Sequence, residues 1–228
     1  MGRAKRASTG GLIFHVLNRA NARQRIFDHN DDYTACERVL QEAVERYETR
    51  LLAYCLMPNH WHMVVWPRKD DELSRFIGWL TLTHTQRRHA NRQSAGTGHV
   101  YQGRFKSFPV QDDEPFLTVC RYVERNALRA KLVRRVDRWR WSSLWRREHG
   151  DADEQRILSA WPVRCPRDWL EWVQQPQTEQ EEAALRRCVN RGSPFGSESW
   201  VDRRVRRLGL EITLRPRGRP RKQTEKGS

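Results

Sequence analysis

The order of apolar and polar positions in the first 147 residues predicts a domain that mixes strands and helices. Short apolar runs rich in β-branched residues predict strands, and apolar residues at helical spacing predict helices. In chain order we expect a strand at 11–17, a helix at 31–47, strands at 51–56 and 60–66, a helix at 70–91, a strand or hairpin at 100–110 and a helix at 114–132. The order β-α-β-β-α-β is that of a split βαβ, ferredoxin-like fold. We therefore predict an α+β core in which an antiparallel sheet carries helices on one face, followed by one further helix.

The composition changes after about residue 147. An acidic linker at 150–154 precedes short helical pieces with several tryptophans, and the segment from residue 201 onward is basic and polar. Such a segment is too polar to bury a core and is expected to be disordered when alone, although 200–209 has the pattern of a short helix. We therefore predict three parts: a folded domain at 1–147, a helical extension at 148–200 and a flexible basic tail at 201–228.

The charge of the chain predicts a polyanionic partner. The 228 residues include 43 Lys and Arg against 28 Asp and Glu, which gives a formal net charge of +15 and a pI of about 10.5. Most of the basic residues are arginine, which pairs with phosphate through two hydrogen bonds and stacks on bases. No apolar run reaches the roughly 18 residues of a membrane span, and the N-terminus lacks the apolar stretch of a signal peptide. We expect a soluble, cytoplasmic protein without a membrane partner.

Five scattered cysteines predict free thiols, because their number is odd and none of them forms a C-x-x-C pair. A disulfide framework or a thiolate zinc site would need such spacing. Any metal site must therefore be sought among other residues.

Two histidines flank one tryptophan at the start of the strand predicted at 60–66. Side chains at i and i+2 of a strand point to the same face, so His60 and His62 could chelate one metal ion while Trp61 packs into the core. Neutral imidazole suits divalent transition ions, but a third ligand would have to come from elsewhere. Two histidines on a strand can also be satisfied by backbone carbonyls, so the pair alone leaves both interpretations open.

A tyrosine and an asparagine lie one helical turn apart in the helix predicted at 114–132. Tyr122 and Asn126 share a face at the spacing i, i+4. A tyrosine in an amphipathic helix is commonly a core residue. Here the neighbours Arg121, Arg125 and Arg129 make the helix cationic, and a nucleophilic phenol needs nearby positive charge or a metal-polarised electrophile.

Several separate blocks of the sequence resemble one known family in their order and spacing. The segment 57–65, Met-Pro-Asn-His-Trp-His-Met-Val-Val, resembles the HUH motif (histidine, bulky hydrophobic, histidine) of single-tyrosine transposases. The segment 122–130, Tyr-Val-Glu-Arg-Asn-Ala-Leu-Arg-Ala, resembles the tyrosine-helix signature of the branch called REP-associated tyrosine transposases. Ala127 and Leu128 depart from the Pro-Val usual in that branch, and Lys131 stands where it often has Gly. Further similar blocks lie at 14–19, 102–107 and 141–143, so that the resemblance covers roughly residues 8–147.

The resemblance implies a catalytic domain at 1–147 that cleaves and rejoins single-stranded DNA. It implies that His60 and His62 bind Mg²⁺ or Mn²⁺, with Asn126 as the third ligand and Tyr122 as the nucleophile. Attack of the phenol on the scissile phosphorus would leave a covalent 5′-phosphotyrosine and a free 3′-OH, while the metal neutralises developing charge. No nucleotide cofactor is expected, since the phosphotyrosine bond conserves the energy needed to rejoin strands.

The substrates of the family are short palindromic hairpins dispersed in bacterial genomes, so the implied partner is single-stranded hairpin or palindromic-repeat DNA. Arg19, Arg104 and Lys106 are candidates for contacting it, because loops and hairpins with interleaved aromatic residues can pair phosphates and stack unpaired bases. Solvated surface charge is the alternative for each of them. The oligomeric state, monomer or homodimer, stays open because related transposases exchange tyrosine helices between subunits.

The tail contains a second candidate DNA-binding motif. The segment 215–222, Arg-Pro-Arg-Gly-Arg-Pro-Arg-Lys, resembles an AT-hook. Glycine permits close approach to a narrow minor groove, and arginines seek the negative potential of A·T-rich DNA there. The candidate arginines are Arg215, Arg217, Arg219 and Arg221. The alternative is a generic basic tail that binds phosphates without preference.

The leading hypothesis is therefore a metal-dependent endonuclease and strand transferase with a tyrosine nucleophile. A non-catalytic, domesticated DNA-binding protein with the same fold is the main alternative. A metallonuclease that uses water would cleave DNA without a covalent protein–DNA species.

Overall fold

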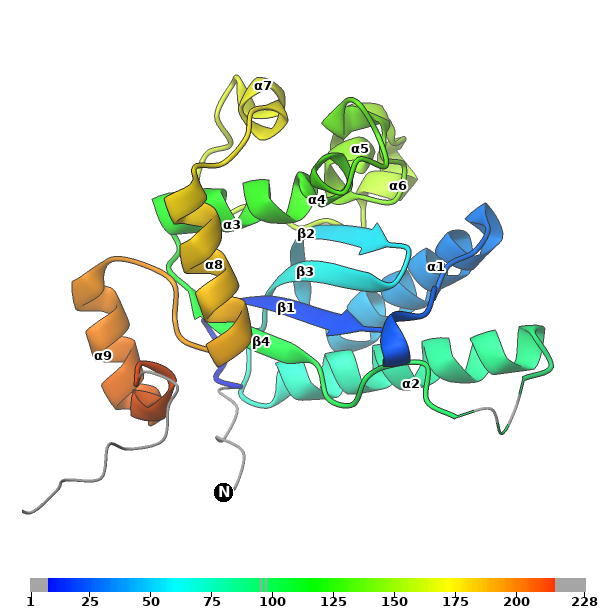
Figure 1. Cartoon of the computed structure of the whole chain (residues 1–228), viewed down its shortest axis with the longest axis horizontal. Helices are drawn as coiled ribbons and strands as arrows, with labels where there is room; N and C mark the ends of the chain where they lie inside the picture. The colour runs from blue at the N-terminus through cyan, green and yellow to red at the C-terminus, as the bar shows by residue number, and fades with distance from the viewer. Residues whose placement is uncertain (1–7, 95, 97, 216–228) are drawn as a thin grey trace, which may run out of the picture.

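A four-stranded antiparallel sheet forms the centre of the molecule (Figure 1). The computed structural model describes residues 8–94, 96 and 98–215. The strands lie in the order β2-β3-β1-β4, and each pairs antiparallel with its neighbours. Their bounds are Ile13–Arg19 for β1, Arg50–Met57 for β2, His60–Trp66 for β3 and Lys106–Val110 for β4. The predicted α+β, ferredoxin-like order is confirmed, and β3 has the predicted bounds.

The register of the sheet decides which side chains share a face. On the central strands, His60 lies opposite Arg19 and His62 lies opposite Leu17. Residues directly opposite each other point to the same side of an antiparallel sheet, so the two histidines share one face with Arg19. Trp61 points to the other face and is 1% exposed, as the alternation of the strand predicts.

The face that carries Trp61 is covered by α1 (Asn30–Tyr47) and α2 (Glu72–Asn91). Apolar residues at helical spacing on both helices pack with Phe14, Trp61 and Val65 into one buried cluster. Trp61 Nε1 donates to the hydroxyl of Tyr101, which fixes the indole within this cluster. The two helices of the split βαβ unit thus lie on one face of the sheet, as predicted.

The opposite face is covered by α3 (Glu114–Glu124), which packs against β2 and β3, and by the short α4 (Asn126–Arg129). The single helix predicted at 114–132 is wrong in two details. Its regular geometry is interrupted at Arg125, whose φ and ψ are −80° and −5°, although the Arg125 amide still bonds to the carbonyl of Arg121. It also ends at Arg129, because Lys131 adopts a left-handed φ of 58° that an α-helix cannot continue.

The hairpin alternative for 100–110 is not formed within the described residues. Only Lys106–Val110 is a strand, and the preceding segment joins the sheet through an isolated bridge between Tyr101 and Ala20. The exposed residues Gln102, Gly103 and Arg104 form the connection between them.

The C-terminal extension packs on the core rather than standing apart from it. After α4 the chain forms the helices α5 (Ser143–His149), α6 (Ala152–Gln155), α7 (Trp169–Gln174), α8 (Glu179–Arg191) and α9 (Glu198–Leu208), together with the 3₁₀ turns Val136–Arg138 and Glu211–Thr213. The predicted boundary at 147 falls inside α5, and the one at 201 falls inside α9.

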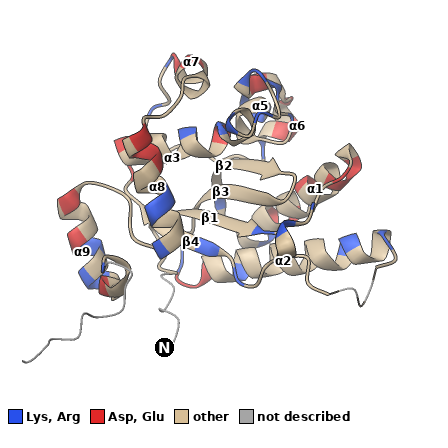
Figure 2. Cartoon of the chain, viewed as in Figure 1, with Lys and Arg blue, Asp and Glu red and all other residues tan. Residues whose placement is uncertain are grey.

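The first part of the predicted flexible tail is folded. Val205 and Leu210 are each 4% exposed, so α9 and the turn after it bury apolar side chains that the basic composition concealed. No described helix has the length and apolar character needed to cross a membrane. Charged residues lie mainly on the helices around a sheet whose strands are largely uncharged (Figure 2).

Candidate active site

His60 and His62 lie side by side at the centre of the sheet, with ring centroids 5.1 Å apart. Burial, aided by the charges of Arg19 and Arg129, lowers the pKa of His60 to about 4. Burial and the neighbouring rings of His60 and His15 hold the pKa of His62 well below its ordinary value. Both imidazoles are therefore neutral at pH 7, the form that binds metal ions.

Each imidazole has a partner on its Nδ1 atom. The Nδ1 of His60 lies 2.7 Å from the side-chain oxygen of Asn59, and the Nδ1 of His62 lies 2.9 Å from the Nε2 of His15. A metal-binding histidine is typically held in this way by a group on its second nitrogen. The pair therefore fits a divalent metal ion, with the two Nε2 atoms as the ligands.

Tyr122 reaches this pair from α3, on the helix layer above the same face of the sheet. Its ring centroid lies 5.8 Å from that of His62 and 6.1 Å from that of His15, in edge-on arrangements. The side chain is 6% exposed. The structure thus brings together the histidines and the tyrosine that the sequence places 60 residues apart.

Asn126 lies one turn further along, and its amide is oriented by two contacts. Its Nδ2 donates to the carbonyl of Tyr122 at 3.2 Å, and its Oδ1 accepts from Arg129 Nη2 at 2.6 Å. One lone pair of the amide oxygen remains, so Asn126 could still be a ligand. Within the described residues no group of three or more His, Cys, Asp or Glu could hold a metal, and the amide oxygen of Asn126 is a candidate third ligand of another type.

Arg129 is a functional candidate that the sequence reasoning did not single out. Its guanidinium carbon lies 4.2 Å from the ring centroid of Tyr122, and it is half-buried. Among the described residues no carboxylate forms an ion pair with it. A guanidinium that is partly desolvated and lacks a carboxylate suits a phosphate. The sequence could have indicated this contact, because Arg129 lies seven residues after Tyr122, and residues about two helical turns apart lie on the same side of a helix.

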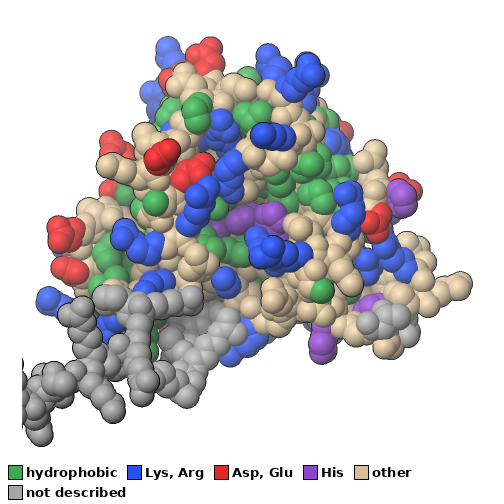
Figure 3. Space-filling model, viewed as in Figure 1, with side chains coloured by type: hydrophobic (Ala, Val, Ile, Leu, Met, Phe, Trp, Pro, Cys, Tyr) green, Lys and Arg blue, Asp and Glu red, His purple; other side chains and the backbone are tan. Residues whose placement is uncertain are grey.

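The predicted DNA-contacting residues Arg19, Arg104 and Lys106 lie at different places relative to His60 and His62. Arg19 is adjacent, since it faces His60 across the sheet and its charge acts on that imidazole. Lys106 begins β4 on the same sheet face and is exposed, and Arg104 is exposed in the connection before it. On the face seen in Figure 1, histidine side chains lie centrally with Lys and Arg around them (Figure 3).

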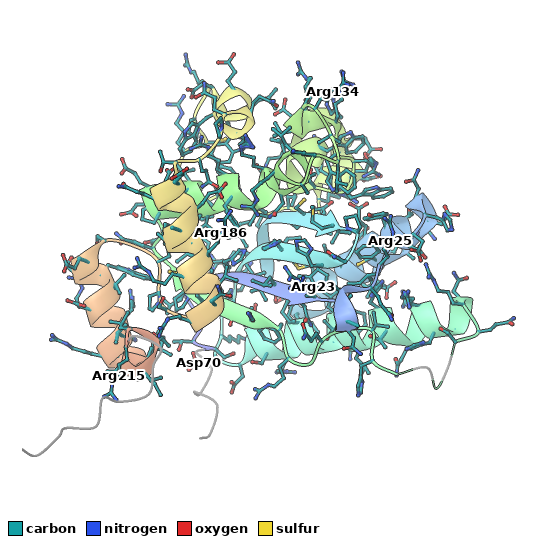
Figure 4. All side chains as sticks on the ribbon, viewed as in Figure 1. Arg23, Arg25, Asp70, Arg134, Arg186 and Arg215 are labelled. Atoms are coloured by element: carbon teal, nitrogen blue, oxygen red, sulfur yellow. The ribbon has the colours of Figure 1, made fainter. Side chains whose placement is uncertain are left out.

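Other basic residues lie near this face or away from it. Arg23 ends the 3₁₀ turn Asn21–Arg23 that follows β1, and Figure 4 shows it beside the end of that strand. Arg215 is exposed after the turn that follows α9, and in Figure 4 it lies apart from the sheet. Arg217, Arg219 and Arg221 lie outside the described residues.

Two of the three arginines expected to make the tyrosine helix cationic have a structural role instead. Arg121 is 5% exposed. It donates to the carbonyls of Trp172, Gln175 and Pro176 at 2.9, 3.0 and 2.9 Å. Arg125 Nε donates to the same carbonyl of Gln175 at 2.8 Å. Of the three, only Arg129 lies against the Tyr122 ring. Arg121 and Arg125 bond to backbone carbonyls of the extension instead.

Comparisons of sequence and structure give the family of the chain. The family model described as IS200-like transposase matches residues 8–126, just over half of the chain. A protein of Haemophilus influenzae assigned as a REP-associated tyrosine transposase is 23% identical over 146 residues, which cover 60% of this chain and 81% of that protein. The fold is similar to that of a REP-associated tyrosine transposase solved bound to a REP hairpin, with a TM-score of 0.53, 20% identity and coverage of 64% of this chain and 84% of the other. The chain belongs to the family of IS200-like transposases.

Proposed function

We propose that this transposase is a metal-dependent single-stranded DNA endonuclease and strand transferase that uses Tyr122 as its nucleophile. The observation that carries the proposal is the contact of the Tyr122 ring with the neutral histidine His62 on one side and with Arg129 on the other. A phenol in a buried core position would not need a cation and a pair of metal-competent imidazoles around it. Hairpin or repeat DNA is the proposed substrate, because a relative of similar fold was solved with a REP hairpin.

In the proposed reaction the Tyr122 oxygen attacks the scissile phosphorus and the bond to the 3′ oxygen breaks. The phenol proton passes to solvent, and the departing 3′ oxygen takes up a proton to become a 3′-OH. Arg129 contacts the phosphate and offsets charge that develops on its oxygens. A divalent metal held by His60 and His62, with Asn126 as a third ligand, would polarise a non-bridging oxygen when bound. Attack on the phosphotyrosine by another 3′-OH reverses these steps and joins strands.

The test is the covalent complex between protein and DNA. A labelled single-stranded hairpin is incubated with the protein and Mn²⁺ and then separated on a denaturing gel. We expect a labelled band at the protein position for the wild type and for Tyr47→Phe, and none for Tyr122→Phe. Tyr47 is a matched control because it lies at the end of α1, on the other face of the sheet.

The other outcomes identify the alternatives. Hairpin binding without cleavage would support a non-catalytic DNA-binding protein. Cleavage without a covalent band would indicate a metallonuclease that uses water. A covalent band with Tyr122→Phe would show that another residue is the nucleophile.

A further inference from the structure

His15 is a fully buried polar residue in the middle of β1, and the function proposed above gives it no role. It is 0% exposed. Its ring centroid lies 4.8 Å from that of Phe108, 5.1 Å from that of His62 and 6.1 Å from that of Tyr122. Burying an imidazole among apolar and aromatic side chains costs free energy that an apolar residue would not incur. Its neighbours on the strand, Phe14 and Val16, are apolar and equally buried.

In the described part of the chain, the His15 side chain has a single hydrogen bond, between its Nε2 and the Nδ1 of His62 at 2.9 Å. A single proton can occupy this contact, so one ring donates and the other accepts. If His62 is to offer the lone pair of its Nε2 to a metal, its proton must be on Nδ1. His15 must then accept that proton through Nε2 and carry its own proton on Nδ1.

Within the part of the chain that the structure describes, the Nδ1 of His15 is unpaired, which supports a role of His15 toward His62 alone. Among the described residues, the Nδ1 of His15 is a buried side-chain atom without a hydrogen-bond partner. A histidine kept only to stabilise the fold would be expected to satisfy both nitrogens. The contact to His62 is therefore retained although it leaves the other nitrogen unpaired.

His60 shows the same arrangement with a different partner. Its Nδ1 lies 2.7 Å from Asn59 Oδ1, and an amide oxygen can only accept, so that contact requires a proton on Nδ1 of His60. Both histidines of the pair thus have a hydrogen-bond partner on Nδ1, the turn residue Asn59 in one case and His15 of the neighbouring strand in the other. Such partners typically fix both the ring orientation and the tautomer of a metal ligand.

We infer that His15 is the positioning residue of His62: it accepts the Nδ1 proton and thereby directs Nε2 of His62 toward the metal. This inference rests on the proposed function for the metal itself. It adds that strand β1, which lies between the histidine strand and β4, is part of the metal site although it supplies no ligand.

The test compares His15→Phe with His15→Gln. Phenylalanine keeps the ring that packs on Phe108 and removes the hydrogen bond, whereas glutamine keeps an acceptor near the position of Nε2. Mn²⁺ binding to each full-length protein is measured by calorimetry and electron paramagnetic resonance. In metal-free protein, the protonated nitrogen of His62 is identified by ¹⁵N NMR.

We expect His15→Phe to raise the Kd for Mn²⁺ about 10- to 100-fold, the usual effect of losing the partner of a metal-binding histidine. His15→Gln should recover most of this loss. In the wild type and in His15→Gln, His62 should carry its proton on Nδ1, and in His15→Phe this preference should be lost. Phe108→Leu is the structural control, since it removes the ring against His15 without touching the hydrogen bond, and should leave the Kd within about two-fold.

Two results would overturn the inference and can be told apart. If the wild type binds Mn²⁺ and His15→Phe binds it equally well, His15 has no positioning role while the proposed metal site stands. If the wild type binds no Mn²⁺, the metal part of the proposed function fails and the inference fails with it. Should His15→Phe not fold, His15→Leu makes the same comparison with a smaller side chain.

Discussion

Replacing Arg121 by methionine separates two interpretations of the tyrosine helix. The sequence predicted that Arg121 adds to the positive charge around Tyr122, whereas the structure buries it against the extension. Its guanidinium donates to the carbonyls of Trp172, Gln175 and Pro176 and lies 4.7 Å from the ring centroid of Trp172. Methionine keeps the apolar stem and removes these interactions. We expect Arg121→Met to destabilise the protein and to leave its affinity for DNA unchanged.

The expected loss of stability follows from these contacts. A hydrogen bond from a charged donor contributes about 1.5–3 kcal/mol, so three of them set an upper limit of roughly 5–9 kcal/mol. The guanidinium loses its hydration on folding, and the carbonyl of Gln175 keeps its bond to Arg125 in the variant. Both effects reduce the net value, and we expect the free energy of unfolding to fall by about 2–4 kcal/mol.

The assay is urea unfolding followed by tryptophan fluorescence, because Trp172 lies directly at the altered contact. Binding of a labelled hairpin is measured in EDTA at two salt concentrations. Arg134→Met is the matched control, since Arg134 is exposed in the segment that follows α4, and it should change stability by no more than about 0.5 kcal/mol. Unchanged stability with weaker, less salt-dependent hairpin binding would refute the reasoning and assign Arg121 to the DNA.

Three further predictions concern the buried carboxyl of Glu124, the guanidinium of Arg19 beside His60, and the tail at 216–228. Glu124 is fully buried, and burial raises its pKa above the ordinary 4.5. Its stabilising contribution is therefore present below pH 4.5 and is lost as the pH rises through the raised pKa. As the pH rises above 4.5, the melting temperature of Glu124→Gln should increase relative to that of the wild type, and parallel profiles would contradict this. Arg19→Ala should weaken hairpin binding and lower the salt slope by about one, measured by titration in EDTA; an unaltered slope would mark a solvated charge. Removing residues 216–228 should weaken binding to A·T-rich duplex more than to G·C-rich duplex, with covalent-complex formation retained, and an equal loss on both would indicate a generic basic tail.

Local patterns in the sequence were sufficient for the core and for the pairing of the two histidines. The bounds of β3 and the order of the split βαβ unit follow from alternation and helical spacing, which depend on residues close in the chain. The orientation of Trp61 toward the core follows from the same alternation. Tyr122 was placed near His62 through the resemblance to a family, since nothing in the spacing of the chain connects residues 60 positions apart.

The partners of the buried polar residues could not be predicted, because they are distant in the sequence. His15 and His62 are 47 residues apart, and Arg121 is 51 residues from Trp172. A lone histidine in an apolar strand and an arginine on a basic helix both resemble ordinary residues of their elements. The end of the tyrosine helix was not predicted for another reason. Lys131 adopts a positive φ, which residues with a side chain rarely adopt, so a lysine at this position does not indicate the end of a helix.

The segment around Tyr122 has residues on two sides of the helix: one side faces the histidine pair, and the other side bonds to the C-terminal part of the chain. At about 100° per residue, Tyr122, Asn126 and Arg129 fall on one side and contact one another at the histidine pair. Arg121 and Glu124 fall on another side. Glu124 accepts from Ser143 Oγ at 2.6 Å and from Trp169 Nε1 at 2.8 Å.

Ser143 and Trp169 therefore connect the block at 141–143 and the extension to the helix that carries Tyr122. A chain cut at residue 147 would leave Glu124 without its tryptophan donor and Arg121 without the three carbonyls. Leaving one member of a buried polar network unpaired generally costs more than the network contributes. For this reason we expect the extension to fold together with the domain predicted at 1–147, and we expect the position of Tyr122 over His62 to depend on residues that the family signature does not contain.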